Sequence, residues 1–322
     1  MHLWLPEPNA YEPILNRAEA EQHVREHLAK YTDALRTLVD YGTHLIPRCW
    51  NSSPRKLRDV VILPILLKQI VSMLDAAAEL MGRGCVDPAM LQVRSAFEAS
   101  VYLDWIIQSK LATRARVYYV WNIRRGLRWA RRGLRGTREA RAFAADMKGL
   151  TITSRLDTPS KQAELRDEVK GILDHLAERK NAAWNQRFDA KRRRRIHDVD
   201  WYQVLFKNRR SLRYLARCTH RMAEYRIVYE LGSEIMHSSS SRSHVRVMDG
   251  GTLEIRSLRE LTDFPFVFQV LVATALHSYQ AVLRAYRPEE AVNFSRKYVD
   301  TWQQAFMEHL TIAYEYHPVT IG

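Results

Sequence analysis

Apolar residues recur at intervals of three and four over most of the chain, and this spacing constrains the fold more than any other feature. Val24, Leu28, Tyr31, Leu35 and Leu38 set the pattern in the first long segment. Such spacing places apolar side chains on one face of a helix. Only 12 Gly and 11 Pro occur in 322 residues, and most of the prolines stand between periodic segments. The sequence therefore predicts an all-α helical bundle.

Helix start signals subdivide this pattern. Ser53-Pro54, Asp87-Pro88 and Thr158-Pro159 each pair a capping side chain with a proline that fits the first helical turn. The predicted helices cover about residues 18–41, 55–81, 89–110, 113–134, 137–147, 159–179, 208–237, 263–286 and 288–314. Residues 180–199 lack regular apolar spacing and carry a run of five basic residues, so we predict a mobile loop there.

One segment has the alternating pattern of β-structure. Val245, Val247, Leu253 and Ile255 flank Asp249-Gly250-Gly251, which predicts a β-hairpin insertion at about residues 244–256. No internal repeat and no clear linker interrupts the remainder of the chain. We therefore predict an N-terminal arm and helical segment at 1–53, followed by a helical bundle domain at 54–322 that contains the hairpin.

The composition indicates a cytoplasmic protein. The three cysteines have no CxxC spacing, which argues against a disulfide framework and against a zinc site. The N-terminus lacks the basic and apolar regions of a signal peptide, and the longest uninterrupted apolar run spans eight residues, so no membrane segment is expected. Histidines at metal-ligand spacing and glycine-rich phosphate loops are both missing, so we expect no metal and no cofactor.

The net charge of +14 and the isoelectric point near 9.8 favour nucleic acid or an acidic protein as the partner. The alternative is a solvated basic face that only maintains solubility. Arginines between residues 124 and 135 follow four-three-four spacing, which aligns them on one helix face, and Trp121 and Trp129 are interleaved with them for base stacking. The predicted nucleic-acid-binding residues are Arg124, Arg128, Arg131, Arg135, Arg192, Arg193 and Arg194.

Two further segments combine ionisable and apolar residues. Arg94 and Glu98 lie four apart on one face of an apolar helix, as either a clamp between helices or part of a site. Tyr229, Ser233 and His237 stack at the same interval, and His237 stands where its helix should end. A capping histidine beside core tyrosines is the structural alternative. The predicted catalytic residues are Arg94, Glu98, Tyr229, Ser233 and His237.

These two segments carry a resemblance. RSAFEASVYLDW, followed by YRIVYELGSEIMHSSS, resembles a bacterial family catalogued as domain of unknown function 5677, whose members have an Arg-x-x-x-Glu helix and a late helix ending in Ser-x-x-x-His. Arg94 and Glu98 match the first element, and Ser233 and His237 match the last. Trp184, Trp201 and Tyr202 fall where the family often has aromatic residues. The resemblance covers about residues 60–285.

The family is similar in turn to the HEPN helical bundles, many of which are metal-independent ribonucleases of toxin–antitoxin and anti-phage systems with active sites completed across a dimer. The resemblance implies RNA as the partner, a homodimer and an antitoxin. The HEPN signature places a histidine four to six residues after an arginine, whereas Arg226 precedes His237 by too many residues. The nearest equivalent is spatial, with Arg94 packed beside His237.

The predicted site has the groups that RNA cleavage needs. A histidine can transfer protons near neutral pH, and an arginine can stabilise the charge that develops on phosphate. The leading interpretation is therefore an RNA-binding, HEPN-like, metal-independent endoribonuclease. The second is a non-catalytic module that binds nucleic acid or an acidic partner, in which the Arg/Glu/His cluster is structural. The third is a small-molecule sensor that uses the same polar pocket.

Overall fold

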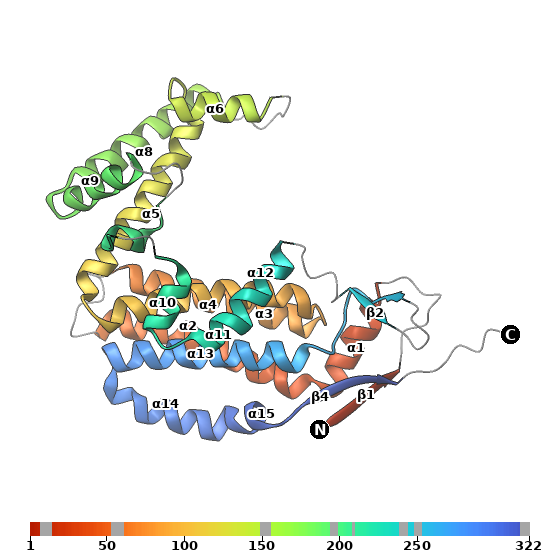
Figure 1. The fold of residues 1–322 in the computed structure, drawn as a ribbon. Helices are drawn as coiled ribbons and strands as arrows, with labels where there is room; N and C mark the ends of the chain where they lie inside the picture. Colours follow the sequence, from red (N-terminus) through yellow and green to blue (C-terminus); the bar gives the residue numbers. More distant parts are fainter. Residues whose placement is uncertain are drawn as a thin grey trace. The chain divides into compact units, whose positions relative to one another are not determined.

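The computed structural model describes residues 1–6, 15–52, 61–148, 156–193, 199–207, 210–237, 244–247 and 253–315. These residues are mostly helical, which confirms the predicted all-α class (Figure 1). The chain divides into two compact units. Unit 1 comprises residues 1–109 and 212–322, and unit 2 comprises residues 110–211. The division between these units does not coincide with the domain boundary predicted at residue 53. That boundary stays a prediction.

Four long helices form the core of unit 1, and the N-terminal helix α1 (Arg17–His27) packs on two of them. The four are α2 (Ala29–Ser52), α3 (Ile62–Gly82), α4 (Val86–Gln108) and α13 (Phe264–Tyr286). Helix α4 packs against α3 and α13, and α2 packs against the same two helices (Figure 1). Their apolar faces bury large side chains such as Phe97, Phe268 and Tyr279, so hydrophobic burial holds the bundle together. The predicted start at Ser53-Pro54 lies outside the described residues.

Helix α13 is the one described helix that is long and apolar enough to cross a membrane by length and composition. The helix itself was predicted at 263–286, whereas its length as a candidate membrane span was not, because polar residues interrupt its apolar runs. More than half of its most apolar window is buried inside unit 1, and its contacts with α2, α3 and α4 make it a core helix of the bundle.

The predicted helix at 208–237 is broken. It forms α10 (Leu212–Cys218), α11 (Met222–Glu224), the π-helix η3 (Tyr225–Glu230) and α12 (Leu231–Met236). The break follows α10, where His220 has a left-handed backbone with φ of 58° and the Arg221 amide donates to the Ala216 carbonyl. This hydrogen bond and this conformation are those of a Schellman helix end, a position that glycine usually occupies.

Two small sheets complete unit 1. The hairpin prediction is confirmed in its described part, because β2 (Val245–Val247) pairs antiparallel with β3 (Leu253–Ile255). The last predicted helix is shorter than expected. After η5 (Pro288–Glu290) it continues only through these three elements: α14 (Ala291–Lys297), η6 (Tyr298–Trp302) and α15 (Gln303–Met307). Strand β4 (Thr311–Glu315) then pairs in parallel with β1 (His2–Pro6), which gives the N-terminal arm a partner.

Unit 2 is a separate helical assembly. Its elements are α5 (Leu111–Gly133), α6 (Arg138–Asp146), α8 (Pro159–Ala177), α9 (Arg179–Arg193) and the short 3-10 helix η2 (Trp201–Leu205). Helix α5 packs against all the others. Thr158 caps α8 as predicted, because its hydroxyl oxygen accepts from the Lys161 amide at 3.3 Å.

The mobile loop predicted at 180–199 is wrong for most of its length, because residues 179–193 form helix α9. Buried Asn181 and Phe188 attach this helix to unit 2 although its sequence is mostly polar. Two anchoring side chains therefore suffice where the apolar spacing is too sparse to predict a helix. Residues 194–198 lie outside the described part.

Candidate functional site

Three of the five predicted catalytic residues come together in unit 1. The Arg94 Nε donates a hydrogen bond to Ser233 Oγ at 3.0 Å, and the Arg94 guanidinium carbon lies 4.2 Å from the centre of the Tyr229 ring. The Ser233 hydroxyl in turn donates to the Tyr229 carbonyl at 2.6 Å. Residues 139 positions apart in sequence thus form one partly buried cluster.

Glycine 232 permits this approach. A Cβ at that position would lie 2.8 Å from the Cβ of Arg94, closer than ordinary atomic contact. The preceding π-helical turn stacks Tyr225 on Tyr229, with ring centres 5.0 Å apart and planes inclined by 16°. Burial raises the pKa of Tyr225 above its usual range. Such π-helical turns are frequent at functional sites, so this face of unit 1 qualifies as a candidate.

The other two predicted catalytic residues lie differently. Glu98 accepts a hydrogen bond from the Tyr102 hydroxyl at 2.7 Å, and no ion pair joins Glu98 to Arg94, both of which lie in the described part. Arg94 turns toward α12 instead, and the catalytic roles of Arg94 and Glu98 stay a prediction. His237 is exposed at the C-terminal end of α12, as its position predicted. Within the described ranges its imidazole has no hydrogen bond to Arg94 or Glu98.

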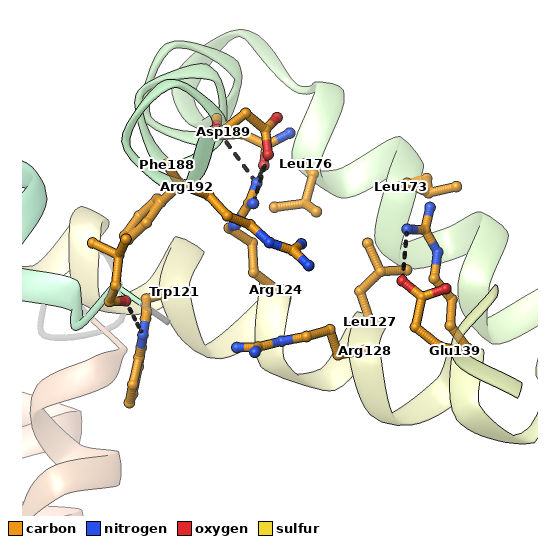
Figure 2. Close-up of a pocket in the computed structure, with 13 residues that line it drawn as sticks. Trp121, Arg124, Leu127, Arg128, Glu139, Leu173, Leu176, Phe188, Asp189 and Arg192 are labelled. Carbon is orange, nitrogen blue, oxygen red and sulfur yellow. Dashed lines mark hydrogen bonds and ion pairs between the residues drawn. The ribbon is translucent and has the colours of Figure 1, made fainter. Parts of the chain in front are cut away.

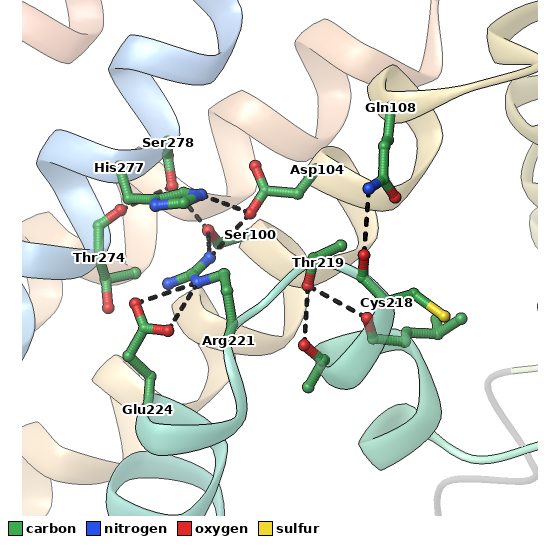
Figure 3. Close-up of polar contacts among 12 residues, drawn as sticks. Ser100, Asp104, Gln108, Cys218, Thr219, Arg221, Glu224, Thr274, His277 and Ser278 are labelled. Atoms are coloured by element: carbon green, nitrogen blue, oxygen red, sulfur yellow. Dashed lines mark hydrogen bonds and ion pairs between the residues drawn. The ribbon is translucent and has the colours of Figure 1, made fainter.

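A second polar cluster in unit 1 was not predicted (Figure 3). Arg221 is 2% exposed, and its Nη1 lies 3.1 Å from Asp104 Oδ2 while its Nε donates to both oxygens of Glu224 at 3.1 and 3.2 Å. The same Nη1 donates to Ser100 Oγ, which also accepts from Ser278 at 2.9 Å. The guanidinium carbon lies 4.9 Å from the centre of the Phe97 ring.

This cluster contains a carboxylate–histidine pair. His277 Nε2 lies 2.7 Å from Asp104 Oδ2, and the side chain of Asp104 is 9% exposed while that of His277 is 41% exposed. A carboxylate in this position fixes the orientation and tautomer of an imidazole, as in catalytic sites. The imidazole is thus held on one side and accessible on the other.

The cluster escaped detection because its members come from α4, the α10–α11 turn and α13. Arg221 and Asp104 are 117 residues apart, and Arg221 is one of many arginines in the sequence. A signal was nevertheless present. Ser100 and Asp104 are polar residues four apart within an apolar helix, and such a pair needs a polar partner when it is buried.

The basic charge of the protein belongs to unit 2. Residues 110–211 contain 27 Lys and Arg against 11 Asp and Glu, a net charge of +16, whereas the remainder contains 23 against 25, a net charge of −2. Anionic partners are therefore attracted to unit 2.

The predicted arginine stripe of α5 is largely engaged within unit 2. Arg124 pairs with Asp189 at 2.6 Å and also donates to Asn185, and Arg131 lies 4.0 Å from Glu139 (Figure 2). Arg135, two residues beyond the end of α5, pairs with Asp157 at 2.8 Å. The first two pairs face α9 and α6, the neighbours against which α5 packs. These arginines therefore contribute to the structure of unit 2 as well as to its charge.

Arg125 and Arg132, each one residue after a member of the predicted stripe, are exposed to solvent. Trp129 is 61% exposed and the Arg132 guanidinium carbon lies 4.3 Å from its ring centre, while Arg125 lies 4.7 Å from the centre of the Trp121 ring. We call these four residues the arginine–tryptophan face. Together with Arg128, Val199 and Asp200 they line an open hollow of about 300 Å³.

A second hollow, of about 190 Å³, lies between α5, α8 and α9 (Figure 2). Arg192, predicted to bind nucleic acid, lines it and is exposed. The side chain of Arg193 and the whole of Arg194 lie outside the described residues. Across the described ranges, no three His, Cys, Asp or Glu residues are grouped to hold a metal ion.

Comparison with known proteins gives one match. A family of unknown function (DUF5677) matches residues 59–252, which is more than half of the chain. The chain belongs to this family. The matched region contains Arg94, Ser233 and Arg221 together with all of unit 2, and it ends before α13, which carries His277. No curated protein and no solved structure matches the chain. The similarity to HEPN bundles stays a prediction.

Proposed function

We propose that this family member is a cytoplasmic protein that binds single-stranded nucleic acid, RNA before DNA, through the arginine–tryptophan face of unit 2. The observation that carries the proposal is Trp129, a large apolar side chain left 61% exposed beneath an arginine. Indole rings stack on bases of any sequence, and the adjoining guanidinium groups attract the phosphates. The net charge of +16 on unit 2 supports the same partner.

The test is fluorescence anisotropy with a labelled 12-nucleotide single-stranded RNA. Stacking on one aromatic side chain contributes about 1–3 kcal/mol, so Trp129→Ala should weaken binding by about 5- to 100-fold. Trp50 of unit 1 is also exposed, and Trp50→Ala is the matched control that should leave affinity unchanged. Equal affinities for all three proteins would reject the arginine–tryptophan face.

An acidic protein, such as an antitoxin, is the competing partner for a basic surface. Its binding would depend on arginine charge and salt but would not require base stacking. Salt-dependent binding of an acidic protein that is insensitive to Trp129→Ala, with no binding of the single strand, would favour this alternative. The predicted homodimer is a separate proposal, which sedimentation velocity tests directly.

Metal-independent RNA cleavage is the second candidate function, and the Asp104–His277 pair favours it. In this proposal His277 takes the proton of a ribose 2′-hydroxyl, and that oxygen bonds to the adjacent phosphorus as the bond to the 5′ oxygen breaks. The leaving 5′ oxygen takes a proton from water, and His277 returns its proton to the resulting hydroxide. The reaction yields a 2′,3′-cyclic phosphate and a 5′-hydroxyl and needs no metal.

Two histidine variants distinguish the sites. Incubation of RNA with EDTA should leave wild-type cleavage intact, and His277→Ala should reduce it by about 100-fold or more, as expected for loss of one general base. His237→Ala should then behave like wild type. The reverse result would return the role to the predicted Arg94, Tyr229, Ser233 and His237 set. Absence of cleavage by wild-type protein would leave unit 2 as a binding module.

A further inference from the structure

We infer that the hollow between α5, α8 and α9 accommodates one unstacked nucleotide of the bound strand, which makes unit 2 selective for single-stranded over double-stranded nucleic acid. This role rests on the proposed function, since the strand must first lie on the arginine–tryptophan face. Four features of the hollow carry the inference: its apolar wall, its basic rim, its size and its position.

The wall is apolar. Leu127, Leu173, Leu176 and Phe188 line the hollow from three helices, and Figure 2 shows Leu173 and Leu176 projecting from α8 toward α5. A planar base transferred to such a wall leaves water, so the hydrophobic effect favours its insertion. A phosphate alone would gain nothing from these side chains.

The rim is basic. Arg124, Arg128, Arg131 and Arg192 line the same hollow against the two carboxylates of Glu139 and Asp189. The set therefore carries a net charge of +2, which attracts an anion. Arg124 is fixed in place by Asp189 and lies 5.5 Å from the centre of the Phe188 ring, so part of this charge is rigidly positioned beside an aromatic wall. Apolar wall and basic rim together match the two ends of a nucleotide.

The size and position agree. A volume of about 190 Å³ lies below the roughly 300–1,000 Å³ of pockets that bury whole drug-sized ligands, which suits a single base whose ribose and phosphate stay at the rim. The hollow shares Trp121, Arg128 and Val199 with the hollow of the arginine–tryptophan face. A strand stacked on that face can therefore place its next base in this one, whereas a base within a duplex must first be unpaired and unstacked.

The experiment fills the hollow without disturbing the face. Leu173 is 41% exposed, so Leu173→Trp adds bulk at the mouth of the hollow with little effect on folding, and Leu173→Glu adds a charge that repels phosphate. Ala163→Trp is the matched control, because Ala163 is an exposed residue of the same helix that does not line the hollow. Circular dichroism melting confirms that each full-length variant is folded.

The probe is a 12-nucleotide RNA with a single 2-aminopurine, whose fluorescence rises when the base leaves its stack. With wild type and Ala163→Trp we expect the 2-aminopurine fluorescence to rise when the strand binds, and at least tenfold weaker binding of the duplex. Leu173→Trp and Leu173→Glu should abolish the rise and weaken single-strand binding about tenfold. Binding of the strand without any rise, or a rise that survives both Leu173 variants, would overturn the inference while the proposed function stands. No binding of the strand by wild type would overturn both.

Discussion

The two units use arginine in opposite ways. In unit 1, Arg221 is 2% exposed and has Asp104 and Glu224 as partners, within a region whose charges nearly cancel. In unit 2, Arg125 and Arg132 are exposed over tryptophan rings, within a region of net charge +16. A buried guanidinium must satisfy its charge inside the protein, whereas an exposed one keeps its charge for a partner. Burial therefore separates an arginine that maintains the fold from one that is available for binding.

Removing the buried arginine should have the largest effect. Arg221→Gln leaves the side chains of Asp104 and Glu224 without their cation, and breaking a buried pair costs about 3–5 kcal/mol. We expect a loss of that size in the free energy of unfolding, measured by urea denaturation. The exposed control, Arg125→Gln, should change it by less than about 0.5 kcal/mol. Equal effects would remove the distinction between the two kinds of arginine.

Two glycine-to-alanine substitutions test how tightly the residues around a glycine are packed in each unit. Gly42→Ala places a methyl group against the Tyr279 hydroxyl, which donates to the Leu38 carbonyl at 3.1 Å within the core of unit 1. Overpacking of this kind should destabilise the protein by about 1–3 kcal/mol. Gly126→Ala in α5 meets nothing within 4 Å and should stabilise it by about 0.5–1 kcal/mol. Thermal melts of both variants measure the contrast, and a stabilising Gly42→Ala would show that the core can relax.

Salt titration tests the charge of the exposed face. Each phosphate neutralised on a single strand contributes about −0.7 to the slope of log affinity against log salt concentration. Arg125→Gln combined with Arg132→Gln should therefore reduce the slope by about 1.4 and weaken binding at low salt. Arg213→Gln combined with Arg226→Gln removes the same charge from exposed positions of unit 1 and should leave the slope unchanged. Identical slopes for the two double variants would mean that the binding surface extends beyond unit 2.

The backbone at His220 gives a smaller effect. A non-glycine residue in the left-handed region costs about 1–2 kcal/mol, of which glycine's extra freedom in the unfolded chain offsets about half. His220→Gly should therefore raise the free energy of unfolding by about 0.5–1 kcal/mol, measured by urea denaturation. A loss of stability would mean that the exposed imidazole makes a contact of its own.

Asp87 gives the smallest effect and concerns the pH dependence of unit 1. Burial, with Asp263 and Glu260 nearby, raises the pKa of this carboxyl above its usual range. The folded state then binds the proton at a pH where the unfolded chain has lost it, so the stability contributed by the protonated form is lost as pH rises through the folded pKa. Asp87→Asn should reduce this decline. The free energy of unfolding of variant and wild type would be measured between pH 3 and 7. Parallel curves would show that the raised pKa of Asp87 does not affect stability.

Local patterns predicted most of the helices. The positions of α3, α4, α5, α8 and α13 follow from apolar spacing, and the Thr158 cap was correct, because these signals act between residues a few positions apart. The same reasoning misjudged α9, where two buried side chains replace a regular apolar face. It also extended the last helix through residues 308–314, where pairing with the N-terminal strand decides the conformation.

The candidate sites also differ in how far the sequence predicted them. Arg94, Tyr229 and Ser233 were predicted as a group and lie together, since each stands on a helix face that must pack against another. Arg94 and Glu98, four residues apart on α4, have different partners in Ser233 and Tyr102, because a side chain on the same helix competes with partners on other helices. Arg221, Asp104 and His277 were unpredictable as a group, because no sequence spacing connects three separate elements.

The sequence by itself determined the helical class, the capping of α8 and the total charge of +14, all of which depend on composition or on neighbours along the chain. Only the tertiary structure decided where that charge acts. Among the arginines of α5, Arg124 and Arg131 are paired with carboxylates, while Arg125 and Arg132 are exposed and lie over the indole rings of Trp121 and Trp129. Adjacent positions on a helix differ by about 100° in direction, so packing of α6, α8 and α9 against one side of α5 engages one stripe and leaves the other open to solvent.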